Sequence, residues 1–233
     1  AMIRSGTYQK VLVIGSERIT WFFNWSNRDT AVLFGDGAGA VVVEPSQQES
    51  GLLYSHLGCE GDAADALQLP NFGTAGNRFI EDYAAFQVQF DGREIFRRAV
   101  KGMTQETEIV LDKLGLTQAD IDRIIPHQAN LRIIESLAKH LSVDMSKVEV
   151  NIDKYGNTSA ATIPVALVEA LEAGRIEAGD RILLAAFGAG LTRAAGLLRW
   201  GERTEPLRTS DAELPPCTQT ALEIVGESIK LTL

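Results

Sequence analysis

The sequence predicts an α/β fold, because apolar runs typical of strands alternate with apolar patterns typical of helices. Residues 11–15 and 181–187 are apolar runs of strand length. Before the second run, one helical face is marked by apolar residues at steps of three and four: Leu131, Ile133, Ile134, Leu137, Ala138 and Leu141. Polar or glycine-rich corners follow three predicted strands, at His127, at Asn157 and at 187–190. Since ligands usually bind where the strands of such sheets end, these corners predict the site.

Composition and charge limit the possible functions. The 233 residues suit one large domain or two small ones, and no apolar run is long enough to cross a bilayer. A net charge of −9 argues against general nucleic-acid binding. Cys59 and Cys217 match no metal or disulfide spacing, which makes a reducing cytoplasm the expected location. His56, His127 and His140 show no zinc-ligand spacing either.

The first residues are expected to lead into a strand and an aromatic segment. Residues 1–6 resemble the last turn of a helix, and residues 11–15 predict a fully buried strand. The aromatic stretch 19–27 is expected to form a loop or short helix that lines a cavity or an interface. The alternative, that these aromatic side chains are simply core, stays open.

A glycine run then joins two predicted strands, 30–34 and 41–43. Residues 35–40 lack the Gly-Lys-Ser/Thr of a nucleotide-binding loop and precede a strand, not a helix. We therefore predict a tight strand-to-strand turn with close backbone packing.

The rest of the chain continues the alternation. Strands are predicted at 51–58, 121–125, 148–152, 181–187 and 191–200, and helical patterns at 78–114, 131–141 and 160–172. Asp91 and Gly92 interrupt the first helical pattern, Gly115 ends it, and Thr117 with Asp120 predicts a capping box. The remaining segments are expected to be irregular at 59–77, an extended tail at 202–216, and one more strand or short helix at 220–233.

His127 and Asn157 carry the chemistry that the sequence predicts. An imidazole N–H and a carboxamide N–H can both donate to one oxygen, and such a pair stabilises negative charge on a thioester carbonyl. Backbone N–H groups at 187–190 offer a second oxyanion site. No Gly-x-Ser-x-Gly elbow is present, which argues against a serine hydrolase. A nucleophile beside the pair is missing, and on spacing alone His127 is also compatible with a structural role.

Three motifs resemble those of the β-ketoacyl-acyl-carrier-protein synthase III family: Phe34-Gly35-Asp36-Gly37-Ala38-Gly39-Ala40, Pro126-His127-Gln128-Ala129-Asn130 and Tyr155-Gly156-Asn157-Thr158-Ser159-Ala160. The resemblance runs from residue 1 to about residue 200 and implies a thiolase-like fold, a mixed sheet with helices on both faces. It implies a decarboxylative Claisen condensation in fatty-acid or related lipid biosynthesis. In that reaction a Cys–His–Asn triad joins an acyl-coenzyme A starter to a malonyl-carrier-protein unit. No cofactor or metal is implied, since the coenzyme A thioester is a substrate.

The resemblance also implies roles for single residues. His127 and Asn157 match the triad's histidine and asparagine, and the backbone N–H of Ala189 matches an oxyanion donor. Contacts with substrate or coenzyme A are implied for Arg28, Gly92, Arg93, Ala129, Asn130 and Phe187. Arg93 replaces a small polar residue of the family, which leaves the detail of its contact open. A basic patch for the acidic acyl carrier protein is implied at Arg97, Arg132 and Lys139, with ordinary solvated helix charges as the alternative.

The family's nucleophilic cysteine has no counterpart here, because neither Cys59 nor Cys217 lies at its place. We therefore expect the C-terminal portion of a longer enzyme, or one part of a split protein, that is inactive alone. Residues 1–47 are then a remnant of the N-terminal thiolase-like half, 48–200 the C-terminal half, and 201–233 an extension. The expected partners are the missing half or a second polypeptide, and a second copy in a homodimer.

Two other functions stay open. A thiolase-fold relative could condense two acyl-coenzyme A molecules or take a longer or aromatic starter, which the aromatic stretch 21–25 and Arg93 favour. A non-catalytic partner subunit is the second alternative. The intact His127 and Asn157 argue against it, because a purely structural subunit does not need them. A cysteine encoded upstream would separate these possibilities.

Overall fold

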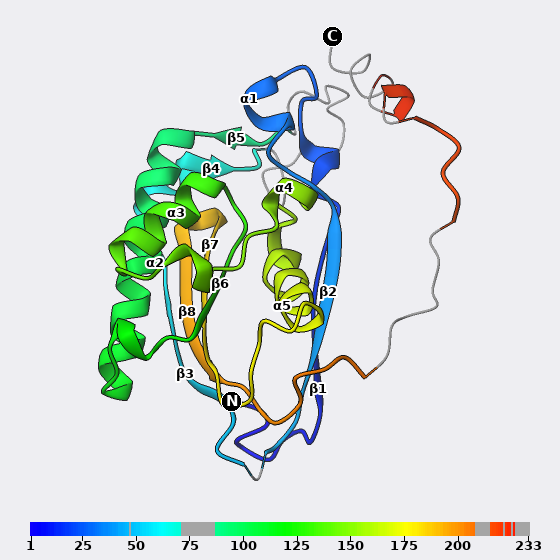
Figure 1. Ribbon diagram of the computed structural model, residues 1–233. Helices are drawn as coiled ribbons and strands as arrows, with labels where there is room; N and C mark the ends of the chain where they lie inside the picture. Colours follow the sequence, from blue (N-terminus) through cyan, green and yellow to red (C-terminus); the bar gives the residue numbers. More distant parts are fainter. Residues whose placement is uncertain (47, 71–86, 208–214, 221, 225, 227–233) are drawn as a thin grey trace.

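The computed structural model describes residues 1–46, 48–70, 87–207, 215–220, 222–224 and 226. Its elements form layers, seen from left to right in Figure 1: two helices, a four-stranded sheet, a single helix and a two-stranded ribbon. Strands and helices alternate along the chain, which confirms the predicted α/β class. The predicted division of the chain at residues 47 and 200 stays a prediction.

The four-stranded sheet sets the place of the predicted corners. Its strand order is β3 (Gly51–Gly58), β8 (Thr192–Arg199), β7 (Arg181–Gly188) and β6 (Arg123–Pro126). β8 is antiparallel to both of its neighbours whereas β6 and β7 are parallel, so the sheet is mixed. Because parallel strands end at the same edge, the residues that follow β6 and β7 come together there.

Helices cover both faces of this sheet (Figure 1). α2 (Gly92–Leu114) and α3 (Leu131–His140) lie on one face, and α5 (Thr162–Glu172) lies on the other. Side chains of a strand alternate between the two faces, so Ile124 of β6 joins the core under α2 and α3 while Ile125 packs toward α5.

The ends of α2 are where the sequence placed them. The side chain of Asp91 accepts hydrogen bonds from the backbone N–H groups of Arg93 and Glu94, which caps the first turn. Gly115 follows the last turn with φ 67°, a left-handed conformation that favours glycine. The earlier part of the predicted helical stretch, residues 78–86, lies outside the described residues. The helical prediction was wrong for residues 89–90, which form the short strand β5 (Gln89–Phe90).

The two-stranded ribbon is formed by β1 (Val11–Glu17) and β2 (Gly37–Val43), and it packs against α5. The turn predicted for the glycine run was wrong. The glycines lie mostly within β2 and do not form a turn. Close packing was predicted correctly: a Cβ on Gly39 would lie 2.8 Å from the Pro164 ring, and one on Gly15 would lie 2.4 Å from the carbonyl oxygen of Ala160. These glycines let the ribbon lie directly on the start of α5.

Three strand predictions were wrong. Strand β1 exists but is not fully buried: Leu12 is 59% and Ile14 61% exposed. These side chains are exposed because α5 covers only one face of the ribbon. Residues 30–34 do not form a strand. α1 (Arg28–Ala31), whose start is capped by the Asn27 side chain accepting from the N–H of Asp29, extends into this range, and only Phe34 pairs, with Asn157. Of residues 148–152, only Val148 pairs, with Ile124, and α4 (Ile152–Tyr155) follows.

Short elements complete the described chain: β4 (Leu67–Gln68), β5 (Gln89–Phe90) and 3-10 helices at Ile19–Phe22, Gly61–Ala66, Gln118–Asp120, Met145–Lys147, Ser159–Ala161 and Ala189–Leu191. The capping box of Thr117 and Asp120 forms as predicted. The predictions for residues 71–77 and for most of 220–233 fall outside the described residues. No helix of the described part is long and apolar enough to cross a membrane.

Candidate active site

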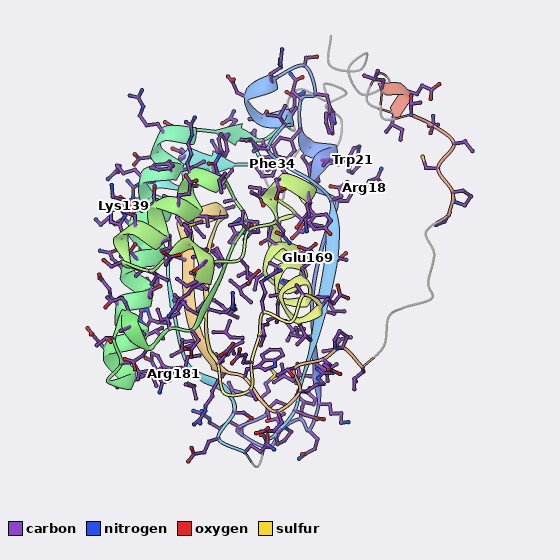
Figure 2. All side chains as sticks on the ribbon, viewed as in Figure 1. Arg18, Trp21, Phe34, Lys139, Glu169 and Arg181 are labelled. Carbon is purple, nitrogen blue, oxygen red and sulfur yellow. The ribbon has the colours of Figure 1, made fainter. Side chains whose placement is uncertain are left out.

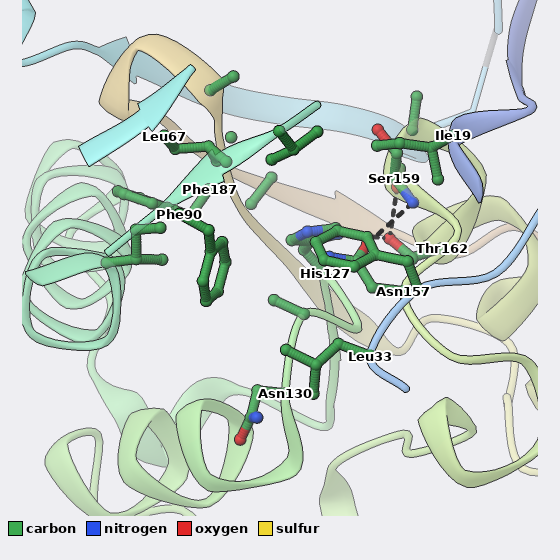
Figure 3. A pocket seen from close by; sticks show the side chains of 18 of the residues that line it. Ile19, Leu33, Leu67, Phe90, His127, Asn130, Asn157, Ser159, Thr162 and Phe187 are labelled. Atoms are coloured by element: carbon green, nitrogen blue, oxygen red, sulfur yellow. Dashed lines mark hydrogen bonds between the residues drawn. The ribbon is translucent and has the colours of Figure 1, made fainter. Parts of the chain in front are cut away.

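A large apolar pocket opens at the edge where β6 and β7 end. Its volume is about 1300 Å³, and its walls come from the ribbon, both sheet faces and the loops around them (Figure 3). The apolar lining combines aliphatic side chains with six phenylalanines: Phe22, Phe23, Phe34, Phe90, Phe96 and Phe187. Ile19 and Trp21 also line it, so the first part of the aromatic stretch 19–27 lines a cavity, as predicted, whereas residues 24–27 do not.

His127 is held at the pocket wall by its backbone and by its neighbour. The backbone N–H of His127 donates to the carbonyl oxygen of Ala185 at 2.7 Å, which extends the β6–β7 pairing by one residue. The fully buried Gln128 then fixes the turn: its Nε2 donates to the carbonyl oxygens of Pro126 at 2.9 Å and Glu149 at 3.0 Å. Its Oε1 accepts from the N–H of Asn151 at 3.0 Å.

The imidazole of His127 is neutral at physiological pH. Burial disfavours the charged ring and lowers the pKa of His127 from 6.5 to about 4. Its Nδ1 lies 2.6 Å from Oγ1 of Thr162, and the ring borders the pocket (Figure 3). A neutral ring carries a single N–H, so which nitrogen bears the proton decides what the ring offers the pocket.

Asn157 reaches the same wall from a different segment. Its backbone N–H donates to the carbonyl oxygen of Leu33 at 2.8 Å, and its carbonyl oxygen accepts from the N–H of Gly35 at 3.1 Å. Its side-chain Oδ1 accepts from the N–H of Ser159 at 2.9 Å. This bond fixes the orientation of the amide and leaves its NH₂ group to donate into the pocket (Figure 3).

Gly35 lets its own backbone come close to the backbone around Asn157. A Cβ at Gly35 would lie 2.0 Å from the carbonyl oxygen of Tyr155, so only a residue without one fits between these backbones. The sequence predicted only a tight turn with close backbone packing for the glycine-rich motif. In the fold, its Gly35 also fixes the position of Asn157 at the pocket wall.

The other predicted residues divide into two groups. Seven line the same pocket: Gly92, Arg93, Ala129, Asn130, Arg132, Phe187 and Ala189. Arg28 at the start of α1, Arg97 on α2 and Lys139 on α3 do not line it. Their predicted roles in binding stay predictions.

The predicted basic patch (Arg97, Arg132 and Lys139) is not uniformly positive. Arg97 forms an ion pair with Glu94 at 2.7 Å, and hydrogen bonds from Arg97 and Arg98 lower the pKa of Glu94 to about 2. Lys139 is exposed on the outer helical layer, away from the ribbon end where Arg18 and Trp21 lie (Figure 2). Arg132 is exposed at the start of α3 and borders the pocket.

Sequence reasoning missed three residues around the pocket. Gln128 lies inside a quoted motif, so its place beside His127 was a usable signal, whereas nothing local marked Thr162.

Arg193 also lines the pocket, and its Nε donates to the buried Glu106 at 2.6 Å. Burial raises the pKa of Glu106, but hydrogen bonds from His56 and Arg193 outweigh burial and lower it overall. Arg193 is therefore held by a buried carboxylate.

Neither cysteine of the chain lies at this site. Cys59 and Cys217 are exposed, and neither lines the pocket. Among the described residues, no cluster of three or more His, Cys, Asp or Glu side chains could hold a metal ion.

Family models match most of the chain that forms this site. Residues 1–61 match the family described as 3-oxoacyl-[acyl-carrier-protein (ACP)] synthase III, and residues 111–200 match its C-terminal family. The chain belongs to the 3-oxoacyl-ACP synthase III family. The second match contains both His127 and Asn157, and the first contains the glycine-rich ribbon that packs beside them.

Curated members of this family align with almost the whole chain. A β-ketoacyl-ACP synthase III 2 of Vibrio vulnificus is 52% identical over 230 residues, which is 99% of this chain and 64% of that protein. The corresponding protein of Vibrio cholerae is 50% identical over 98% of this chain and 63% of its own length. The chain thus spans a little under two thirds of these relatives.

Solved structures of 3-oxoacyl-ACP synthase III show the same thiolase-like fold. The Aquifex aeolicus structure has a TM-score of 0.78 and 43% identity, covering 85% of this chain and 60% of that chain. The Pseudomonas aeruginosa structure has a TM-score of 0.79 and 36% identity, covering 86% and 61%. The predicted fold, with a mixed sheet and helices on both faces, is therefore confirmed.

Proposed function

We propose that this chain forms part of a β-ketoacyl-ACP synthase III, which joins an acyl-coenzyme A starter to a malonyl-carrier-protein unit with loss of carbon dioxide. One observation carries the proposal: in a chain of this family, the half-buried His127 and the oriented amide of Asn157 face one apolar pocket. No separate cofactor enters the reaction, since the coenzyme A thioester is a substrate.

Decarboxylation is the step for which this wall is suited. When the malonyl carboxylate leaves as carbon dioxide, its electron pair moves onto the thioester and charge builds on the carbonyl oxygen. The Nδ2–H of Asn157 donates to that oxygen, and His127 adds a second donor through Nε2 when this nitrogen carries a proton. A preorganised donor of this kind contributes on the order of 3 kcal/mol to transition-state stabilisation.

The apolar lining favours the same step. A carboxylate is poorly solvated among aromatic side chains, whereas carbon dioxide is uncharged, so the pocket favours the product over the bound carboxylate. The N–H of Ala189, which follows the end of the neighbouring strand β7, is the proposed donor to the oxygen of the acyl group that the carbanion attacks.

The acyl group requires a nucleophile, which we propose is a cysteine outside these 233 residues. Cys59 and Cys217 are exposed and do not line the pocket, so neither is placed for this role. The proposed partners are the segment or polypeptide that carries this cysteine, a second copy in a homodimer, and the acidic carrier protein. The exposed Arg132 and Lys139 supply positive charge for the last of these.

The two half-reactions test this proposal in the full-length protein. His127→Ala and Asn157→Ala should each lower malonyl-carrier-protein decarboxylation by about a hundredfold or more, and leave acylation of the cysteine by acyl-coenzyme A largely intact. His140→Ala, which removes an exposed histidine on α3, is the matched control and should change neither rate. Loss of acylation with normal decarboxylation would contradict the assigned roles.

A further inference from the structure

We propose that Glu169 is a positioning residue for Asn157. Glu169 lies on α5 (Figure 2), and its carboxylate binds the short helix α4, which ends two residues before the asparagine (Figure 1). Through α4, it sets where the asparagine amide lies at the pocket wall. The effect on catalysis rests on the proposed function, but the position of the amide does not depend on it.

One carboxylate binds three side chains of the α4 segment. Oε2 of Glu169 accepts from Nδ2 of Asn151 at 2.9 Å. Oε1 accepts from the hydroxyl of Tyr155 at 2.8 Å and from Nζ of Lys154 at 3.1 Å. Partial burial raises the pKa of Glu169, but these hydrogen bonds outweigh burial and lower it overall. Because Asn151 precedes the helix and Tyr155 ends it, the charged carboxylate fixes both ends of α4 at once.

The helix α4 has few other contacts to hold it in place. It is four residues long, and a helix of this length is not stable by itself. None of its residues is buried, so apolar packing contributes little to its position. The side chain of Asn151, at the N-cap, does not cap the helix and bonds to Glu169 instead. The position of α4 therefore depends strongly on this carboxylate.

A shift of α4 would displace Asn157. Gly156, with φ 67°, turns the chain directly after Tyr155, and the asparagine is the next residue. The carbonyl oxygen of Tyr155 lies so close to Gly35 that a Cβ there would be 2.0 Å from it. The backbone of Asn157 in turn pairs with Leu33 and Gly35. Any movement of Tyr155 therefore also moves the backbone that carries the amide.

The same contacts connect Asn157 to His127. The backbone N–H of Asn151 donates to Oε1 of the buried Gln128 at 3.0 Å, and Gln128 directly follows the histidine. Asn151 is thus bound through its backbone to the histidine segment and through its side chain to Glu169. Glu169 therefore helps to fix the asparagine relative to the histidine, which two donors to one oxygen require.

Malonyl decarboxylation and cysteine acylation by the full-length protein test this role. Glu169→Ala should lower kcat for decarboxylation by about tenfold, with KM and acylation unchanged, because a displaced donor stabilises the transition state less. Glu169→Gln should stay within about threefold, since its oxygen can accept from Tyr155 and its NH₂ can donate to a flipped Asn151 amide. The control is Glu172→Ala, an exposed glutamate at the end of α5, which should change neither rate.

An equal loss of both reactions in Glu169→Ala would reveal a general structural effect and overturn the proposal. Should Glu169→Ala not fold, the double variant Lys154→Met, Tyr155→Phe removes the two exposed bonds and keeps the buried Asn151 bonded. It should show the same pattern, with a loss of about fivefold in decarboxylation. Unchanged decarboxylation in this double variant would likewise overturn the proposal.

A double-mutant cycle shows whether Glu169 acts through Asn157. Combined with Asn157→Ala, Glu169→Ala should lower decarboxylation by no more than about a further twofold, because no amide is left to misplace. Combined with His127→Ala, its loss of about tenfold should persist, since the asparagine still donates there. A further tenfold loss on top of Asn157→Ala would contradict a role through the asparagine.

An NMR measurement separates this inference from the proposed function. In full-length protein labelled with ¹⁵N-asparagine, and with Asn157→Ala to assign the signals, the side-chain NH₂ signal of Asn157 should move in Glu169→Ala and stay in Glu172→Ala. An unchanged signal in Glu169→Ala overturns the inference. If Asn157→Ala decarboxylates normally, the proposed function fails, and the NMR result still decides the role of Glu169.

Discussion

The wall that carries His127 and Asn157 and the basic patch (Arg97, Arg132 and Lys139) are built in opposite ways. At the wall, buried side chains and backbone hydrogen bonds fix each functional group, and burial changes the pKa of His127. At the patch, the charges are exposed and stand on helix surfaces, and one of them is already paired with Glu94.

This difference predicts different kinds of function. Groups held in a dry, rigid site act through geometry, and small displacements of them change rates strongly. Exposed charges act through long-range attraction, which salt screens and which single substitutions change only modestly. Mutations should therefore affect turnover and stability at the wall, and carrier-protein affinity at the patch.

The largest effect is expected from Gly35→Ala. The new Cβ would lie 2.0 Å from the carbonyl oxygen of Tyr155, and backbone on both sides would have to move, with Asn157 among the displaced residues. We expect the free energy of unfolding to fall by about 4 kcal/mol or more in urea denaturation. The control is Gly61→Ala, whose Cβ would meet nothing within 4 Å and which should stay within about 0.5 kcal/mol. Equal stability of the two variants would show that the glycine does not place Asn157.

The second effect is a pH dependence of stability that comes from His127. Its folded pKa of about 4 lies below the ordinary 6.5, so the unfolded chain binds the proton more readily. The stability is complete above pH 6.5 and is lost as the pH falls toward 4, by about 3 kcal/mol in total. His127→Asn should remove this part of the slope in urea titrations between pH 7 and 4, and His140→Asn should not. A wild-type slope that survives in His127→Asn would mean that the ring is not buried.

The smallest effects are expected at the basic patch. Lys139→Glu should raise KM for malonyl-carrier protein by about tenfold at low salt, and much less at high salt, while KM for malonyl-coenzyme A stays within about twofold. The matched control is Lys113→Glu. Lys113 and Lys139 are both exposed lysines in the last turn of a helix, α2 for Lys113 and α3 for Lys139. Arg97→Ala should have less effect than Lys139→Glu, because the Arg97 guanidinium is already paired with Glu94, a carboxylate that it shares with Arg98. A rise in KM that is equal for both substrates would argue against carrier-protein docking.

Local signals predicted much of this fold from the sequence. Asp91 and Gly115 mark the two ends of α2, and the apolar steps after residue 130 give α3, because caps and helical periodicity act within a few residues. The corners at His127, Asn157 and Ala189 were also found, since each follows a recognisable motif, and all three line one pocket.

What the sequence could not give depends on contacts between distant segments. The exposure of Leu12 and Ile14 depends on which face of the ribbon α5 covers, and an apolar run carries no such information. The bond between Thr162 and His127 depends on how α5 lies against β6, because no spacing rule joins a helix start to a strand end. The glycine run was predicted as tightly packed, but its packing partners only appear in the fold.

The most direct test of the central claim is a crystal structure of the full-length protein with a non-cleavable malonyl thioester analogue bound. We predict that the thioester oxygen lies about 3 Å from Nδ2 of Asn157 and from Nε2 of His127, within hydrogen-bonding reach of both. A thioester oxygen directed away from both side chains, with the malonyl group bound in the same pocket, would contradict the account.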